Sequence, residues 1–162
     1  MKEADPKARN AQRLTECHPT LAASLTRVIT RLEGVEIRPR IQDVWRSPQD
    51  QLTGLLNGST KVKFGFHNVT GADGRKESLA VDLLDDDPPL APGAPYVLRL
   101  AAAAEGLATG ALWGLPTKLK SGTAAAIAAG DFDAPVKVGC DPCHVEPTGI
   151  TIAQAKVGKR PL

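Results

Sequence analysis

The chain has 162 residues, 42% of them hydrophobic and 23% charged, as in a globular domain large enough to form a core without disulfides. Its formal net charge is +2 and only 4% of its residues are aromatic, so the signatures of nucleic-acid binding are missing. No apolar run approaches the roughly 20 residues that cross a bilayer, and no secretory signal peptide is recognisable. We expect a monomeric single domain over residues 1–162, with poorly ordered tails at 1–11 and 154–162 and neither a nucleic-acid partner nor a membrane span.

The first third of the chain predicts four elements bounded by proline or glycine. They are a short polar helix over 6–17, an amphipathic helix over 20–34, a strand over 35–44 interrupted by Pro39, and a helix from Pro48 to about Asn57. Ser47 can cap the last helix, and proline suits its first position. Arg46 therefore lies at a strand-to-helix corner, where its guanidinium can point into a cleft or form a surface ion pair.

The rest of the chain predicts strands and helices around two histidines. They are a strand over 61–66, a turn-rich insert around 71–74, a strand over 78–84, an acidic proline-rich loop over 85–95, helices over 96–109 and 121–129, and strands over 136–140 and 148–152. Residues 111–115 are expected to form either a short strand or a wall of the cleft. The first of these strands leads to His67. Asp82 interrupts the apolar run SLAVDLL, and an ionised carboxylate among apolar neighbours is costly unless it is paired or bound to metal.

Two separate stretches carry residues suited to bind one metal ion. FHNVTGADGRKESLAVD contains His67 and Asp82, and CDPCHVE contains Asp141 and His144. Two imidazoles and one carboxylate can hold zinc and leave a fourth position for a water molecule, whose pKa zinc can lower to about 7. Asp141 is a second carboxylate that can take the proton of that water. If the two stretches meet in space, they predict the zinc site of a hydrolase.

The spacing Cys140-x-x-Cys143-His144 has a competing meaning, because it is also the attachment signature of a c-type haem. Against that interpretation, no export signal is visible, no methionine after the first residue can serve as second axial ligand, and the other histidine stays unexplained. A structural zinc knuckle from the same three residues lacks a second Cys-x-x-Cys pair. Together with Cys17, the three cysteines cannot all pair within one chain.

Four markers occur in a fixed order: WRSPQDQ, then FHN with LAVD, then Trp113-Gly114, then DPCHVE. In these markers, over roughly residues 12–147, the chain resembles the zinc D-Ala-D-Ala carboxypeptidases, the vancomycin-resistance D-Ala-D-Ala dipeptidases and the phage L-alanyl-D-glutamate endopeptidases. WRSPQDQ is similar to the family's Tyr-Arg-Ser-x-x-x-Gln, and FHN with LAVD to its His and Ala-Val-Asp. DPCHVE is similar to its Asp/Glu-x-x-His.

This resemblance implies an α+β fold, with a small, mainly antiparallel sheet, helices on one side and a metal site at the strand ends. It implies a zinc ion with three protein ligands, His67, Asp82 and His144. It also implies that Asp141 is the general base and that Arg46 holds a carbonyl or carboxylate of the substrate. The substrate implied is a peptidoglycan stem peptide or another peptide with D-amino acids.

The chain departs from the family pattern at two places. His67 and Asp82 are 15 residues apart, a longer link than in the better-known members, and Gly65 stands where they have a serine. A hairpin loop containing Gly71 and Gly74 can hold the excess, because the cost of closing a loop grows slowly with its length. The departures bear on substrate choice more than on metal binding.

We therefore expect a zinc-dependent peptidase, either a D-Ala-D-Ala carboxypeptidase or an endolysin-like endopeptidase. Glu146 and Trp113 are expected to support the ligands or line the cleft. A non-catalytic cell-wall or peptide-binding module that keeps the fold is the alternative. The presence of both Asp141 and Arg46 argues against it.

Overall fold

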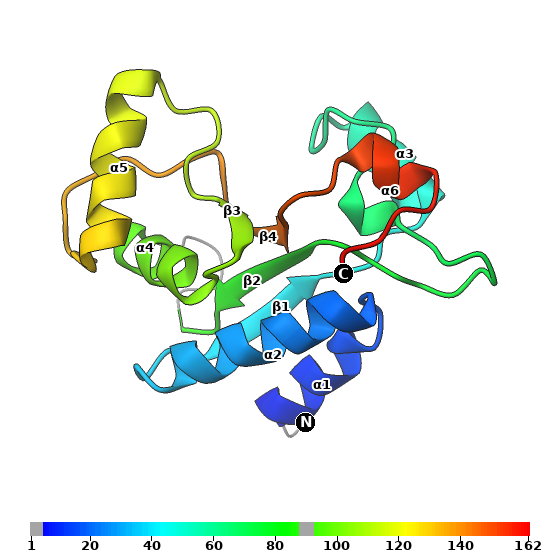
Figure 1. Ribbon diagram of the computed structural model, residues 1–162, viewed down its shortest axis with the longest axis horizontal. Coiled ribbons are helices and arrows are strands. Elements are labelled where there is room, and N and C mark those ends of the chain that lie inside the picture. Colours follow the sequence, from blue (N-terminus) through cyan, green and yellow to red (C-terminus); the bar gives the residue numbers. More distant parts are fainter. Residues whose placement is uncertain (1–4, 88–92) are drawn as a thin grey trace.

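The computed structural model describes residues 5–87 and 93–162. In chain order the elements are α1 (Pro6–Leu14), α2 (Pro19–Glu33), β1 (Pro39–Asp43), α3 (Pro48–Leu56), the 3-10 helix η1 (Phe66–Asn68), β2 (Val81–Asp85), α4 (Ala94–Ala103), β3 (Leu107–Gly110), α5 (Thr117–Ala129), β4 (Asp141–Pro147) and α6 (Ile152–Lys156). The strands form one antiparallel sheet in the order β1-β2-β4-β3, shown in Figure 1. The predicted α+β fold is confirmed. Among the described residues, every helix is too short or too polar to span a bilayer.

The starts of α2 and α3 are set by a capping side chain and a proline. The imidazole of His18 accepts a hydrogen bond from the Thr20 amide at the start of α2, at 3.3 Å. Ser47 Oγ accepts one from the Asp50 amide at the start of α3, at 3.0 Å. Each helix has proline at its first position, which needs no amide donor. These local signals start α3 at Pro48, as predicted, and α2 at Pro19, one residue before the predicted range.

Side-chain alternation along β2 and β4 gives the sheet two different faces. Val81 and Leu83 of β2 and Val145 of β4 are fully buried in the main core, together with the apolar residues of α2 and α4. Because neighbouring side chains in a strand point to opposite faces, Asp82 and His144 point away from that core. Figure 1 shows α1 and α2 along one side of the sheet, with α4 and α5 at one end and α3, η1 and α6 at the other.

A second, smaller core lies in the part that contains η1 and α6. Phe66 and Val69 pack there with Leu79, Ile150 and Ala155, which come from three separate stretches of the chain. This cluster holds η1 beside the sheet. It therefore fixes the segment that carries His67.

Three predicted strands, over 61–66, 136–140 and 148–152, are wrong, and residues 111–115, expected as a strand or a cleft wall, form no strand. These residues lie in turns, bends or irregular backbone, or in the first residues of η1 and α6. A strand needs a pairing partner, and these segments find other partners: the Val62 carbonyl accepts from the Gln51 side chain at 2.6 Å. Likewise, the Cys140 amide donates to the Trp113 carbonyl at 2.9 Å, in a contact between two loops.

Other boundaries also differ from the prediction. The helix expected over 96–109 ends at Ala103, because Gly106, with φ of +84°, turns the chain into β3. Helices α1 and α6 occupy parts of the two segments expected to be poorly ordered. Of the expected acidic loop over 85–95, residues 88–92 lie outside the described residues.

Candidate metal centre

Two of the three predicted ligands come from adjacent strands. Asp82 of β2 and His144 of β4 are direct partners in the antiparallel register. Their side chains point to the same face of the sheet, and His144 Nδ1 lies 3.3 Å from Asp82 Oδ1. The sheet backbone therefore sets the distance between these two groups.

The third predicted ligand, His67, lies in η1 and not at the end of a strand as predicted. Its carbonyl accepts a hydrogen bond from the Arg46 amide at 2.9 Å, and its Nδ1 lies 2.5 Å from the Val44 carbonyl oxygen. These contacts hold η1 against the corner between β1 and α3. His67 Nε2 consequently lies 3.6 Å from Asp82 Oδ1. One candidate ligand atom from each of His67, Asp82 and His144 lies within 4.8 Å of the other two.

The hydrogen-bond partners of the two imidazoles determine which nitrogen faces the centre. The Val44 carbonyl can only accept, so Nδ1 of His67 carries the hydrogen and Nε2 presents its lone pair toward Asp82. The Glu146 carboxylate lies 2.8 Å from Nε2 of His144 and also accepts, so Nδ1 of His144 faces the centre. Orientation of an imidazole by a carbonyl or carboxylate is typical of metal-ligating histidines.

The Asp82 carboxylate is the observation that tests whether a cation fits. Its Oδ1 atom is buried and has no hydrogen-bond partner among the described residues, although two imidazole nitrogens lie close to it. A buried acceptor left without a partner costs about 1–3 kcal/mol, and more when it is charged. A metal ion between the carboxylate and the two imidazole nitrogens would remove that cost. The residues present therefore fit a divalent metal with nitrogen and oxygen ligands.

The pKa values of this cluster point to the same conclusion. Burial opposes ionisation of Asp82, but the two imidazoles beside it outweigh that effect and hold the pKa of its carboxyl well below the usual range. Burial also opposes protonation of His144, yet its contacts with Asp82 and Glu146 raise the pKa of the imidazole to about 9. The metal-free cluster therefore attracts a proton at His144. A cation at the centre would replace that proton.

Asp141, the predicted base, lies at the start of β4 beside the three candidate ligands. Its Oδ2 atom is 3.8 Å from His144 Nδ1, and its side chain is 52% exposed. Partial burial and the nearby Asp82 charge raise its pKa. A carboxylate in this position can exchange protons with a water molecule in the centre, and a raised pKa brings it closer to the value that suits a base at neutral pH.

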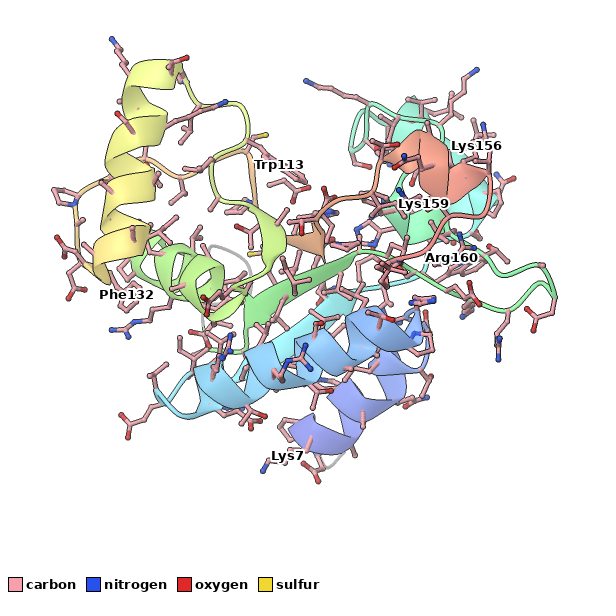
Figure 2. The ribbon with its side chains drawn as sticks, in the orientation of Figure 1. Lys7, Trp113, Phe132, Lys156, Lys159 and Arg160 are labelled. Carbon is pink, nitrogen blue, oxygen red and sulfur yellow. The ribbon has the colours of Figure 1, made fainter. Side chains whose placement is uncertain are left out.

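A close approach between two backbones fixes the position of Asp141. Gly110 of β3 is its partner across the sheet, and a Cβ atom on Gly110 would lie 1.7 Å from the Asp141 carbonyl oxygen. Only glycine permits this distance. The turn after β3 also contacts a candidate ligand: the centroid of the Trp113 ring lies 5.0 Å from that of the His144 ring. Figure 2 shows Trp113 in the loop that follows β3.

Arg46 lies at the predicted strand-to-helix corner, and two side chains hold its guanidinium. Nε and Nη2 donate to the Asp43 carboxylate, and Nη1 donates to Gln51 Oε1 at 3.1 Å. Gln51 is only 2% exposed and is itself fixed by its bonds to Thr60 and Val62. The prediction missed both partners as site residues, although Gln51 is part of the marker WRSPQDQ.

The Cys-x-x-Cys-His stretch does not have an arrangement suited to haem attachment. Cys143 is buried in the main core, whereas Cys140 is exposed, and both are free thiols. Thioether bonds to one haem would need both sulfurs at the same surface. His144 is turned toward Asp82 and Glu146.

The long link between His67 and Asp82 forms a hairpin, as predicted. Thr70 and Lys76 pair across it as an isolated antiparallel bridge, and Gly74, with φ of +78°, makes the turn. Figure 1 shows this excursion extending away from the sheet at the edge of the molecule. The extra residues thus leave both ligand-bearing ends in place.

No protein-family model matches the chain, and no curated protein matches it. Among solved structures, the chain is similar to the crystal structure of the L-Ala D-Glu endopeptidase ChiX of Serratia marcescens, with a TM-score of 0.53 and 18% sequence identity over 87% of each chain. At this identity the likeness concerns the fold. The chain therefore shares the α+β fold of that endopeptidase, and on this fold it brings together two histidines and an aspartate that can hold a metal ion.

Proposed function

We propose that this protein is a zinc-dependent peptidase that hydrolyses a peptide bond in peptidoglycan stem peptides. The observation that supports it most directly is the buried Asp82 Oδ1 atom, which has no hydrogen-bond partner among the described residues and faces two oriented imidazoles. The fold shared with an L-Ala D-Glu endopeptidase supports the substrate class. It also favours cleavage between L-Ala and D-Glu over removal of a terminal D-Ala.

Each residue of the site has a task in such a hydrolysis. His67, Asp82 and His144 would hold the zinc ion, which supplies Lewis acidity that activates water and polarises a carbonyl. Asp141 would take a proton from the attacking water and pass it to the leaving amine. Arg46, held by Asp43 and Gln51, keeps further N–H groups free to donate to a substrate carbonyl or carboxylate.

The first test is the metal content of the purified protein by elemental analysis, compared with a His67→Ala, His144→Ala double variant. We expect about one zinc ion per chain in the wild type, by analogy with three-ligand catalytic sites, and none in the variant. If the wild type neither retains zinc nor takes it up when it is added, the zinc-dependent function is wrong.

The second test is digestion of purified peptidoglycan, with the released fragments identified by mass spectrometry. Asp141→Asn should retain zinc and lose most activity, because an amide cannot take the proton of water. Asp133→Asn, at an exposed aspartate in the loop after α5, is the matched control and should keep full activity. Zinc binding without any cleavage by the wild type would favour a non-catalytic module on the same fold.

A further inference from the structure

Positive charge is concentrated in two segments that are far apart in sequence. The whole chain has 20 basic and 18 acidic residues, yet residues 51–66 and 147–162 together contain five basic residues and no aspartate or glutamate. The five are Lys61, Lys63, Lys156, Lys159 and Arg160. Such a distribution is unexpected in a protein whose net charge is only +2. Whether the five cations can act together depends on whether the fold brings the two segments into contact.

The fold places the two segments against each other. Phe64 from the first segment packs on the small core that contains Ile150 and Ala155 from the second. Lys156 Nζ lies 5.7 Å from the centre of the Phe64 ring. We call the part of the molecule formed by residues 51–66 and 147–162 the basic lobe.

Four of the five cations in the basic lobe are free to meet a partner. Lys61, Lys63, Lys156 and Lys159 are exposed, and none of them lies in an ion pair with another described residue. Figure 2 shows Lys156 and Lys159 at the same end of the molecule.

Arg160 has a different role. It pairs with Glu77 at 2.9 Å and donates to the Thr70 carbonyl at 2.9 Å, which ties the end of the chain to the 69–79 hairpin. It is therefore a structural cation, and the four lysines are the ones available for binding.

The acidic residues next to the basic lobe are engaged elsewhere. Asp50 accepts a hydrogen bond from Ser47 at the start of α3, and Glu146 contacts His144 in the metal centre. Glu77 is paired with Arg160 and also lies 3.7 Å from Arg75. Glu77 is therefore compensated by arginine and Glu146 faces His144, whereas Asp50 bonds a neutral hydroxyl and keeps its charge. The four lysines outnumber this remaining acidic charge.

We propose that the basic lobe binds a soluble polyanion, a flexible polymer that carries repeated phosphate or carboxylate groups. Separate lysines on flexible stems act as point charges and suit a series of anionic groups better than one compact ligand. A lipid surface is the competing partner, because six exposed apolar side chains also belong to the lobe: Leu52, Leu56, Val62, Ile152, Val157 and Leu162. We favour the soluble polymer because α6, with five residues, is too short to lie in a bilayer interface as an amphipathic helix.

The basic lobe adjoins the metal centre along the chain. Residues 61–65 lead directly into η1, which carries His67, so a polymer on Lys61 and Lys63 would lie close to the centre. Binding by the lobe does not depend on hydrolysis. It can therefore be tested whether or not the protein is a peptidase.

The test is fluorescence anisotropy with labelled inorganic polyphosphate at low and at physiological salt. Three proteins are compared: the wild type, a variant with Lys61→Gln, Lys63→Gln, Lys156→Gln and Lys159→Gln, and a control with Lys7→Gln, Lys118→Gln, Lys120→Gln and Lys137→Gln. Both variants lose four positive charges, and the control lysines are all exposed outside the basic lobe. Thermal unfolding checks that each protein is folded.

We expect the wild type to bind polyphosphate with an affinity that falls as salt rises, because binding releases counterions. The lobe variant should bind on the order of tenfold more weakly or worse, with a smaller salt dependence, and the control should stay close to the wild type. Equal losses in both variants would assign binding to net charge and overturn the proposal. So would an absence of binding at low salt, or binding to phosphatidylglycerol vesicles but not to polyphosphate.

Discussion

Asp82 and His144 face each other across adjacent antiparallel strands, with His144 Nδ1 3.3 Å from Asp82 Oδ1. Because the sheet holds both residues, these two candidate ligands are positioned by folding before any metal binds. His67 joins them from η1, through contacts of its backbone and ring with the corner between β1 and α3. A preformed site of this kind makes metal binding a stabilising event for the whole fold.

Zinc should raise the thermal stability of the wild type but not of an Asp82→Ala variant. A ligand that binds only the folded state adds about 2.7 kcal/mol at a concentration one hundred times its dissociation constant. Differential scanning calorimetry with and without zinc measures the shift. The exposed Asp133→Asn variant should respond like the wild type. An equal zinc shift in Asp82→Ala would remove Asp82 from the ligand set.

Glu146→Ala should weaken zinc binding by about 10- to 100-fold, because Glu146 holds Nε2 of His144 and so orients Nδ1 toward the centre. Glu146→Gln keeps an acceptor oxygen and should lose less. Competition with a coloured chelator gives both affinities. If alanine and glutamine have the same small effect, the 2.8 Å contact has no part in metal binding.

Gly110→Ala should destabilise the protein by about 2 kcal/mol or more and lower activity, since its Cβ would lie 1.7 Å from the Asp141 carbonyl oxygen and β3 or β4 must shift. Gly122 in α5 is the matched control, because nothing lies within 4 Å of a Cβ built there. Gly122→Ala should stabilise by about 0.5–1 kcal/mol through helix propensity. Urea unfolding of the two variants should therefore give shifts of opposite sign.

Stability should fall in alkali partly through Cys17. Burial, with the nearby Glu16 charge, raises the pKa of the Cys17 thiol to about 12. An unfolded thiol has a pKa of about 8.5, so stability is unaffected below that pH. Above it, the unfolded state releases a proton that the folded state retains, and stability falls by up to about 1.4 kcal/mol per pH unit until the pH reaches the folded pKa.

Urea unfolding between about pH 8 and pH 11 isolates the Cys17 contribution. The free energy of unfolding of Cys17→Ala should be lower than that of the wild type at pH 8, and it should fall less steeply as the pH rises. Cys140→Ala, at an exposed cysteine, should leave the slope unchanged. Identical slopes in all three proteins would contradict a raised Cys17 pKa.

The features that the sequence predicted well are those that depend on neighbours in the chain. Ser47 and Pro48 start α3 through a local cap, and Arg46 lies at the corner before it. Asp82 was predicted to need a partner because it stands among apolar residues, and in the structure it faces His67 and His144. The roles of these residues in binding and catalysis stay predictions.

By itself, the sequence determined where α1 and α3 begin, the apolar strand that Asp82 interrupts, and the residue types suited to a metal. The tertiary structure decided the contacts between residues that are far apart in the chain. The Val44 carbonyl contacts the ring of His67 and holds it in η1. The Glu146 carboxylate contacts Nε2 of His144. Residues 61–66 have no strand partner among the described residues. Local propensity cannot predict these outcomes, because each hydrogen bond joins groups whose separation is set only when the sheet and its loops pack together.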